Sequence, residues 1–186
     1  MTFLYVVRCN FSDDASRAEW EEWYSTEKQD WLLSRPGFLA GQRFAAVDST
    51  DGIGYLALYA LDSPAALTTP EYSSGWGWGD YRPFIVDWTR NLYEGIGPET
   101  FLTGDDELLE VVVLGIDADT DAAVAARSDL AWSLSDGALD GSASALGVAK
   151  RSATAHATEP VLVAAGWAAG LFRPVSPARY SDLFAS

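Results

Sequence analysis

The chain has 186 residues, of which 48% are hydrophobic, and carries a formal net charge of −15. This length and composition predict a folded chain with a sizeable core, built as one large domain or two small ones. The acidic balance excludes the basic surface that nucleic acid or an anionic membrane needs, so we expect neither as a partner.

The two residue types that carry most metal and nucleophile chemistry are scarce. Cys9 is the single cysteine and His156 the single histidine, which argues against a disulfide framework, a zinc site and a Ser-His-Asp triad. We expect His156 in a polar surface turn, not as a haem ligand. No dinucleotide-binding fingerprint follows a predicted strand. The sequence therefore predicts no cofactor and no metal. Without a basic leader or a long apolar run, it also predicts a cytoplasmic protein.

The first half of the chain predicts a strand-helix-hairpin order. Residues 2–10 are β-branched and aromatic and indicate a strand buried on both faces, followed by a helix that runs to about Ser34. Pro36-Gly37 ends this helix. Strands are predicted at 38–47 and 55–61, and Ser63-Pro64 begins a short helix. The order βαββα is typical of a ferredoxin-like sandwich.

Residues 70–83 interrupt this pattern with glycines, tryptophans and tyrosines in a loop-like composition. Either this segment is a fixed cap over the core, or Trp76 and Trp78 close over a ligand as a lid. In the lid alternative, residues 73–80 are mobile until ligand binds. Residues 84–88 suggest a short helical turn and residues 89–93 a fourth strand.

The pattern begins again after a linker at residues 96–107. A strand is expected at 110–116, a helix from Asp117 to about Leu134 that includes Trp132, strands at 142–151 and 160–167, and a last short helix from Ser176. We therefore expect an α+β chain of two tandem ferredoxin-like repeats, βαββαβ in type, that form one α/β barrel within the chain. Residues 1–95 would be the half with a pocket, and residues 108–186 a degenerate second half.

The first predicted helix carries the strongest hint of chemistry. At about 100° per residue, four aromatic side chains share one of its faces, with Glu27 in their middle and Lys28 at the edge; they are Trp20, Trp23, Tyr24 and Trp31. Burial raises the pKa of a carboxyl group and a neighbouring ammonium lowers it, so this pair could be tuned for proton transfer. Alternatively, Glu27 turns to solvent and Lys28 lies along the aromatic edge without any chemistry.

Residues 2–94 resemble the EthD-like group of the dimeric α/β-barrel superfamily. The matching text is Trp23-Tyr24-Ser25-Thr26-Glu27-Lys28, then Pro36-Gly37-Phe38, Gln42-Arg43-Phe44, and the segments 55–59 and 65–72. The resemblance implies a barrel, usually made by dimerisation, with a pocket between sheet and helices. In relatives this pocket serves cofactor-free isomerisation, cyclisation, decarboxylation or monooxygenation of hydrophobic metabolites. Lys28 stands where the group usually has an acid/base histidine.

These observations leave three functions open. The first is a cofactor-independent lyase, isomerase or cyclase for a hydrophobic aromatic or polyketide-like molecule, and the second is a non-catalytic binding protein of the same fold. The third is a structural barrel whose aromatics are core. The candidate catalytic residues are Glu27, Lys28 and Tyr24. The candidate substrate-binding residues are Trp20, Trp31, Arg43, Tyr72, Trp76, Trp78 and Tyr81. The chain would be a monomer with an internal pseudo-dimer, or a homodimer.

Overall fold

The structure, a computed structural model, describes residues 1–136, 139–154 and 164–182. The strands are β1 Phe3–Phe11, β2 Phe38–Ser49, β3 Tyr55–Leu61, β4 Ile85–Glu94, β5 Glu107–Gly115, β6 Ala131–Leu134, β7 Ala143–Ser152, β8 Trp167–Pro174 and β9 Arg179–Tyr180. The α-helices are α1 Arg17–Trp23, α2 Gln29–Leu33, α3 Pro70–Ser73, α4 Pro98–Phe101 and α5 Thr120–Ala126. A π-helical turn, Tyr24–Lys28, joins α1 to α2, and 3₁₀ turns span Pro64–Thr68 and Gly79–Phe84.

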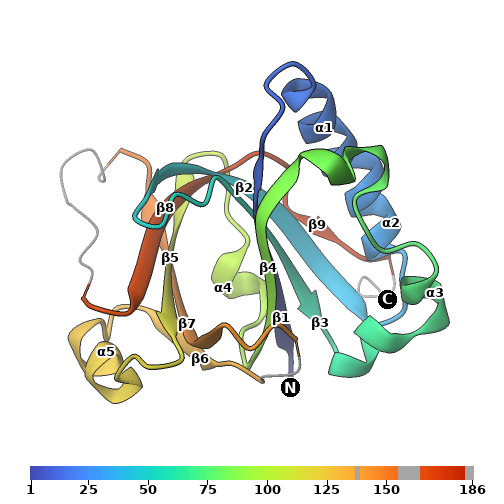
Figure 1. The fold of residues 1–186 in the computed structure, drawn as a ribbon. Helices are drawn as coiled ribbons and strands as arrows, with labels where there is room; N and C mark the ends of the chain where they lie inside the picture. Colours follow the sequence, from blue (N-terminus) through green and yellow to red (C-terminus); the bar gives the residue numbers. More distant parts are fainter. Residues whose placement is uncertain (137–138, 155–163, 183–186) are drawn as a thin grey trace.

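One antiparallel sheet curls through the whole molecule (Figure 1). Its strand order is β4-β1-β3-β2-β8-β5-β7-β6, and β9 adds to β2. The two ends of this order meet, because Tyr93 on β4 forms a bridge with Ser135 just after β6, and the Asp136 amide donates to the Leu92 carbonyl at 2.8 Å. The sheet therefore closes on itself, and few backbone groups remain at an open edge.

Alternation along the strands divides the side chains between the inside and the outside of this barrel. On β1, Leu4 and Val6 belong to the inner core, whereas Tyr5 and Val7 face the helices outside. The inner core takes residues from both parts of the chain and includes Phe44, Leu58, Val111, Val148 and Phe172. The barrel interior is thus a packed core, and the helices cover its outer face.

The α+β class expected from the sequence is confirmed, and so is the strand at 55–61. The helical turn expected at residues 84–88 is a correction: residues 85–88 lie in β4, which pairs with β1 between Ile85 and Glu94, and only Phe84 belongs to a helical turn. The short helical turn instead precedes the strand at Gly79–Phe84. Pairing with β1 overrides the local composition there, because it supplies backbone hydrogen bonds along the entire segment.

Several expectations for the second part are also corrected. The helix after β5 ends at Ala126, and Trp132 lies on β6 opposite Gly147, where a Cβ on residue 147 would crowd Leu130 and the indole. The last strand begins at Trp167 rather than ending there, and residues 179–180 form β9 in place of a helix. Residues 155–163, including His156, lie outside the described residues. Pairing with distant strands determines where these strands lie, and a local sequence pattern contains no information about such pairing.

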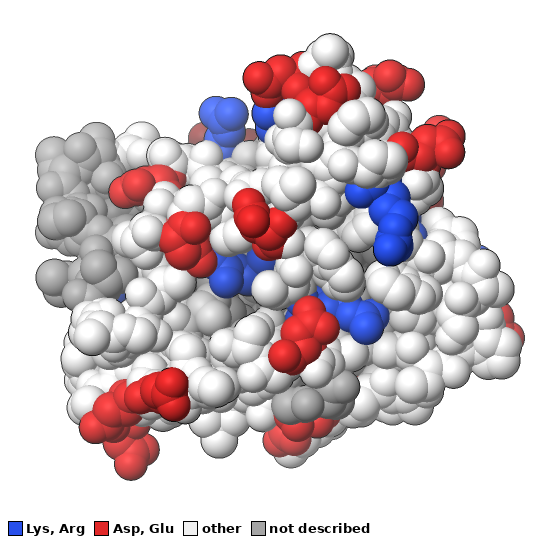
Figure 2. All heavy atoms as spheres, viewed as in Figure 1, with Lys and Arg blue, Asp and Glu red and all other residues white. Residues whose placement is uncertain are grey.

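The surface is predominantly acidic, as the composition requires. Figure 2 shows acidic side chains scattered over one face, several of them beside basic ones. In the second part, Glu110 is buried between Arg127 and Arg151, at 2.8 and 2.7 Å. This cluster joins β5, β7 and the turn after α5. Within the described residues, no helix is long and apolar enough to cross a membrane.

Candidate functional site

The first helical segment presents a row of buried side chains with an unusual spacing. Trp20, Tyr24, Lys28 and Leu32 are all buried and lie four residues apart. In a regular α-helix a spacing of four drifts by about 40° at every step, so the row would leave the core-facing side. The π-helical turn Tyr24–Lys28 holds more residues per turn and removes that drift. As a result, both Tyr24 and Lys28 point into the interior.

The same turn corrects the expected position of Glu27. The sequence places this carboxylate at the centre of the aromatic face, because it assumes α-helical geometry throughout. In the structure Glu27 is exposed and borders a shallow depression on the outer surface, together with Glu19, Trp23 and Tyr81. Lys28 occupies the interior position instead. Because this turn is π-helical, Lys28 faces the interior and Glu27 faces solvent, which is the reverse of the expectation from regular α-helical geometry.

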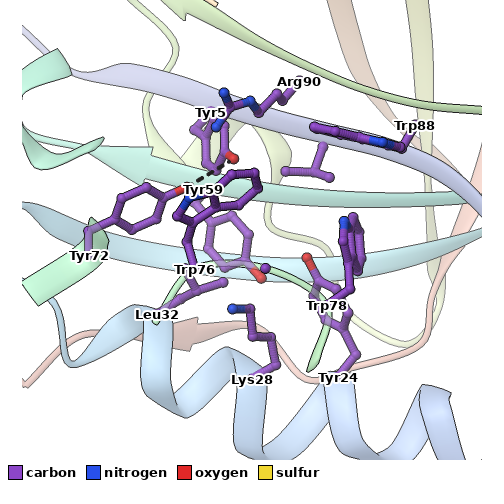
Figure 3. A pocket seen from close by; sticks show the side chains of 12 residues that line it. Tyr5, Tyr24, Lys28, Leu32, Tyr59, Tyr72, Trp76, Trp78, Trp88 and Arg90 are labelled. Atoms are coloured by element: carbon purple, nitrogen blue, oxygen red, sulfur yellow. Dashed lines mark hydrogen bonds between the residues drawn. The ribbon is translucent and has the colours of Figure 1, made fainter. Parts of the chain in front are cut away.

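A pocket lies between the helices and the outer face of the first-half sheet (Figure 3). Its polar and aromatic lining consists of Tyr5, Tyr24, Lys28, Tyr59, Tyr72, Trp76, Trp78, Trp88 and Arg90, with Val7, Leu32 and Gly77 completing the wall. The strands β1, β3 and β4 form its floor, and the helical segment and the loop after α3 form its sides. Among the described residues no carboxylate lines it, in a chain of net charge −15.

Lys28 is the one amine in this pocket. Its side chain is 8% exposed; Nζ donates a long hydrogen bond of 3.4 Å to the Gly75 carbonyl and lies 4.3 Å from the centre of the Trp31 ring. Within the described part of the chain it has no ion-pair partner. Burial without a counter-charge disfavours the ammonium and lowers the pKa of Lys28 from 10.5 to about 8. A fraction of the amine is therefore neutral at physiological pH.

Four tyrosines line the same pocket as this amine, namely Tyr5, Tyr24, Tyr59 and Tyr72, and burial raises the pKa of each, so they stay protonated at neutral pH. The Tyr5 and Tyr72 hydroxyls are hydrogen-bonded at 3.2 Å. The Tyr59 side chain is fully buried; among the described residues its hydroxyl makes no well-formed hydrogen bond, and the Tyr24 hydroxyl is its weak hydrogen-bonding neighbour. Figure 3 shows Lys28, Tyr24 and Tyr59 directing their polar ends toward the same part of the pocket.

Tryptophans close the mouth of the pocket. Trp76 is 40% and Trp88 39% exposed, with ring centres 6.3 Å apart, and the Arg90 guanidinium lies 4.7 Å from the Trp76 ring. Trp78, by contrast, is 7% exposed and packs on Tyr24. The cavity behind them, which is partly open to solvent, has a volume of about 30 Å³. That is room for a water molecule and too little for an aromatic ligand.

Arg43 and Trp20 border a smaller cavity that shares Tyr24 and Trp78 with the main pocket. Arg43 is 1% exposed; its guanidinium lies 4.1 Å from the Tyr24 ring and 4.8 Å from the Trp20 ring. It donates to the Glu21 carbonyl at 2.9 Å and the Ser25 hydroxyl at 2.8 Å. These contacts fasten the helix to β2 and hold Tyr24 in place. Arg43 does not lie at a strand end facing solvent.

The structure brings together half of the ten candidates named from the sequence. Tyr24, Lys28, Tyr72, Trp76 and Trp78 line the main pocket. Trp31 packs behind Lys28 and Tyr72, while Trp20 and Arg43 border the smaller cavity. Glu27 and Tyr81 lie on the separate surface depression. The main pocket lies between the sheet and the helical segment.

Sequence reasoning missed four polar or aromatic residues of the pocket, namely Tyr5, Tyr59, Trp88 and Arg90. A signal was present for all of them, because residues two apart on a strand share a face. Trp88 and Arg90 are such a pair on β4, and Tyr5 faces Tyr59 across β1 and β3. The expectation that β1 is buried on both faces, and that residues 84–88 are helical, hid this alternation.

Comparisons with known proteins identify the fold but not a family. No family model matches the chain, and no curated protein matches its sequence.

Solved structures, however, match over nearly its full length. An anthrone oxidase-like protein superimposes with a TM-score of 0.66 at 11% identity, covering 97% of this chain and 94% of that one. A protein assigned as a monooxygenase from Fusobacterium nucleatum gives 0.55 at 9% identity, with coverages of 96% and 94%. A chlorite dismutase mutant from Candidatus Nitrospira defluvii gives 0.53 at 8% identity, with coverages of 94% and 92%. At these identities the likeness shows the fold alone, an α+β fold consistent with a dimeric α/β barrel.

Proposed function

We propose that the protein is an enzyme that moves a proton on a flat, hydrophobic aromatic molecule without a redox cofactor, with Lys28 as the acid/base. The observation that carries this proposal is the Lys28 amine, buried without a carboxylate inside an aromatic pocket. A base is most effective when its pKa lies near the working pH, and the pKa of Lys28 is lowered to about 8.

The chemistry follows from the lining of the pocket. The neutral Lys28 amine takes a proton from an acidic C–H or O–H group of the substrate, leaving negative charge on a substrate oxygen. Among the described residues the Tyr59 hydroxyl makes no well-formed hydrogen bond, so it can donate one to that oxygen, with Tyr24 beside it. The tryptophan and tyrosine rings supply apolar contact to the rest of the molecule.

The fate of the resulting anion defines the reaction class. Return of the proton to another atom is an isomerisation, ring closure is a cyclisation, and loss of a carbon fragment is a lyase reaction. An electron-rich aromatic anion can also react with molecular oxygen, which is the kind of chemistry named for the anthrone oxidase-like and monooxygenase neighbours. All four begin with the same proton transfer, so the proposal rests on that step.

Ligand entry requires the loop after α3 to move. A cavity of about 30 Å³ cannot hold an aromatic ring, and the exposed Trp76 is the wall that can swing outward with least loss of packing. We propose that residues 73–80 act as a lid in which Trp76 opens while the buried Trp78 stays packed on Tyr24. Glu27 and Tyr81, which border the outer depression, have no part in this proposal.

We further propose that the chain is a tandem duplication that builds alone the barrel that relatives build by dimerisation. In the first half the strand order is β4-β1-β3-β2, and in the second it is β8-β5-β7-β6. If β5 to β8 are numbered one to four, both orders are 4-1-3-2, which supports halves at about 1–95 and 108–186. This proposal includes two further points: the chain is a member of the EthD-like group, and it is a monomer with an internal pseudo-dimer.

Exchange of a substrate proton tests the catalytic proposal directly. Anthrone is a suitable probe, because its ring methylene is acidic and exchange with D₂O is read by NMR without oxygen. The protein should accelerate exchange above buffer, and Lys28→Met should reduce the rate on the order of 10²–10⁴-fold. Lys150→Met, which changes the second lysine of the chain on β7, is the matched control. Equal rates for Lys28→Met and the parent would overturn the assignment.

The alternative function, a binding protein without chemistry, gives a different result in the same experiment. In that case anthrone should quench tryptophan fluorescence, since Trp76, Trp78 and Trp88 line the pocket, while exchange stays at the buffer rate. Adding oxygen to a sample that does exchange then distinguishes isomerase chemistry from oxidation.

A further inference from the structure

The protein gives the Lys28 ammonium little to hold it. An ammonium has three donors, but the described residues offer Nζ a single hydrogen bond, to the Gly75 carbonyl at 3.4 Å, which is at the long limit for such a bond. The Trp31 ring at 4.3 Å adds a cation–π contact. This environment favours the neutral form of the amine, which is a nucleophile as well as a base.

Hydroxyl groups stand beside this amine. Tyr59 is fully buried, its hydroxyl makes no well-formed hydrogen bond with the described residues, and Tyr24 points its hydroxyl toward the same space. Burial raises the pKa of both, so each remains a hydrogen-bond donor at neutral pH. A carbonyl oxygen that accepts from these hydroxyls would bring its carbon toward the Lys28 amine. The surrounding walls are aromatic, which selects a carbonyl attached to a ring system.

We propose that Lys28 forms a Schiff base with an aromatic aldehyde or ketone bound in this pocket. The inference rests on the proposed function, because it uses the same pocket and the same amine. The nitrogen lone pair attacks the carbonyl carbon, a C–N bond forms as the C=O π bond breaks, and a proton passes from nitrogen to oxygen to give a neutral carbinolamine. The hydroxyl then takes up one proton from solvent, the C–O bond breaks with loss of water, and a protonated imine remains. No oxidant or reductant is consumed.

This covalent step would widen the chemistry of the site. A protonated imine withdraws electrons from the neighbouring carbon, so it labilises an adjacent C–H or C–C bond more strongly than a hydrogen-bonded carbonyl. Hydrolysis of the imine releases the product and restores the amine. The substrate class is therefore narrower than that of the proposed function: a flat aromatic compound with a free carbonyl group.

Reductive trapping tests the inference. The full-length protein is incubated at pH 7 with 2-naphthaldehyde and sodium cyanoborohydride, which reduces an imine to a stable secondary amine, and the modified peptides are quantified by mass spectrometry. Lys28 and Lys150 are the two lysines of the sequence, so they compete within one molecule. At pH 7 about a tenth of an amine of pKa 8 is neutral, against less than about one in a thousand for an ordinary lysine. We expect Lys28 to be modified at least about tenfold faster than Lys150.

Variants and competition identify the site. Lys28→Arg keeps the positive charge but forms no imine, so the fast modification should disappear. Lys150→Arg should leave it unchanged. An excess of 2-naphthol, which lacks the carbonyl, should suppress trapping at Lys28 without affecting Lys150.

The outcomes separate the two proposals. If 2-naphthol and 2-naphthaldehyde both quench tryptophan fluorescence but Lys28 is trapped no faster than Lys150, the Schiff base is wrong while the aromatic pocket stands. If neither compound binds and the aldehyde is not trapped at Lys28, both proposals fail.

Discussion

Lys28 and Tyr59 are two pocket residues whose burial lowers the stability of the fold. Among the residues that the structure describes, Lys28 is buried without a counter-charge, and the buried Tyr59 hydroxyl makes no well-formed hydrogen bond. Each arrangement costs folding free energy, because water solvates these groups better than the protein does. Their joint presence on one pocket is a physical reason to regard this pocket, rather than the surface depression beside Glu27, as the functional one.

Lys28→Met should stabilise the protein, and the gain should depend on pH. Below pH 8 the lysine is charged in both folded and unfolded chains, and the full cost of burying the ammonium applies. Between pH 8 and 10.5 the folded chain releases the proton that the unfolded chain still holds, so the parent becomes more stable as pH rises. We expect a difference on the order of 2 kcal/mol at pH 7 that shrinks through this window, allowing for partial contact with water.

Urea unfolding at pH 7 and at pH 10 measures this difference. The other ionisable groups that line the pocket are Tyr5, Tyr24, Tyr59, Tyr72 and Arg90. The tyrosine pKa values are raised, so these hydroxyls remain neutral through the window. A difference that is constant with pH would show that Lys28 keeps its ordinary pKa.

Tyr59→Phe should stabilise the fold and weaken function. Removing a buried, unpartnered hydroxyl relieves a cost of about 1–3 kcal/mol, while it takes away the donor proposed for the substrate oxygen. Tyr93→Phe is a matched control, since the Tyr93 hydroxyl is also buried and unpartnered but its side chain lies in the barrel interior. Thermal unfolding should show a gain for both variants, whereas anthrone exchange should slow for Tyr59→Phe alone. Slower exchange in both would assign the effect to the fold.

At the scale of elements, the π-helical turn decides which residue enters the pocket. Tyr24–Lys28 is five residues of wider helix between two short α-helices. It brings Lys28 inward beside Tyr24 and leaves Glu27 exposed. Such turns are uncommon and often occur at functional sites. The buried side chains at 20, 24, 28 and 32 indicate this turn in the sequence. In a regular amphipathic α-helix the buried positions are spaced by both three and four residues, whereas here the spacing is four each time.

The loop after α3 is the second element that shapes the site. Gly77 has a φ of 129°, a conformation that side-chain-bearing residues rarely adopt, and a Cβ there would meet open space. Gly77→Ala should therefore act through backbone strain alone. Strain of about 1–3 kcal/mol in the closed loop would weaken binding of an aromatic ligand about fivefold or more.

Gly52→Ala is the matched control for this loop. Gly52 also has a positive φ, 74°, and open space around it, but lies in the hairpin turn between β2 and β3. Fluorescence titration with 2-naphthol should give a weaker affinity for Gly77→Ala and an unchanged one for Gly52→Ala. Unchanged affinity in both variants would mean that the loop geometry does not contribute to binding.

At the scale of the whole molecule, the barrel interior makes the two parts of the chain interdependent. The inner core combines residues of β1 to β4 with residues of β5, β7 and β8, and β2 pairs with β8 across the middle of the sheet. Neither part can bury its inner face without the other. We therefore expect one cooperative unfolding transition rather than two.

Phe172→Ala tests this expectation. Phe172 lies on β8, is 2% exposed and packs in the inner core, so its truncation should cost about 3–5 kcal/mol. Leu134→Ala on β6, where the side chain is 62% exposed, should change stability little. Tryptophan fluorescence reports mainly on the first half and circular dichroism on the entire sheet. In Phe172→Ala the unfolding midpoints measured by the two signals should fall together. Separate midpoints would indicate that the two halves unfold independently.

The sequence by itself determined the features that depend on local patterns. Pro36-Gly37 ends the first helical segment before β2, with Gly37 at a φ of 86°, and the continuous apolar run at 55–61 is β3 as predicted. The α+β class and the concentration of candidate residues around the first helix also follow from local patterns. These features rest on backbone propensity and hydrophobic period, which act over a few residues.

Only the tertiary structure decided the exchange of Glu27 for Lys28, the strand character of residues 85–88 and 131–134, and the inclusion of Tyr59 and Arg90 in the pocket. Each depends on partners distant in the sequence. β1 pairs with residues 85–94, Gly147 makes room for Trp132, and the sheet beneath the helix favours a π-turn that keeps four side chains on one row. Packing free energy of this kind exceeds the small local preferences that a sequence pattern reports, which is why the pattern misplaced these residues.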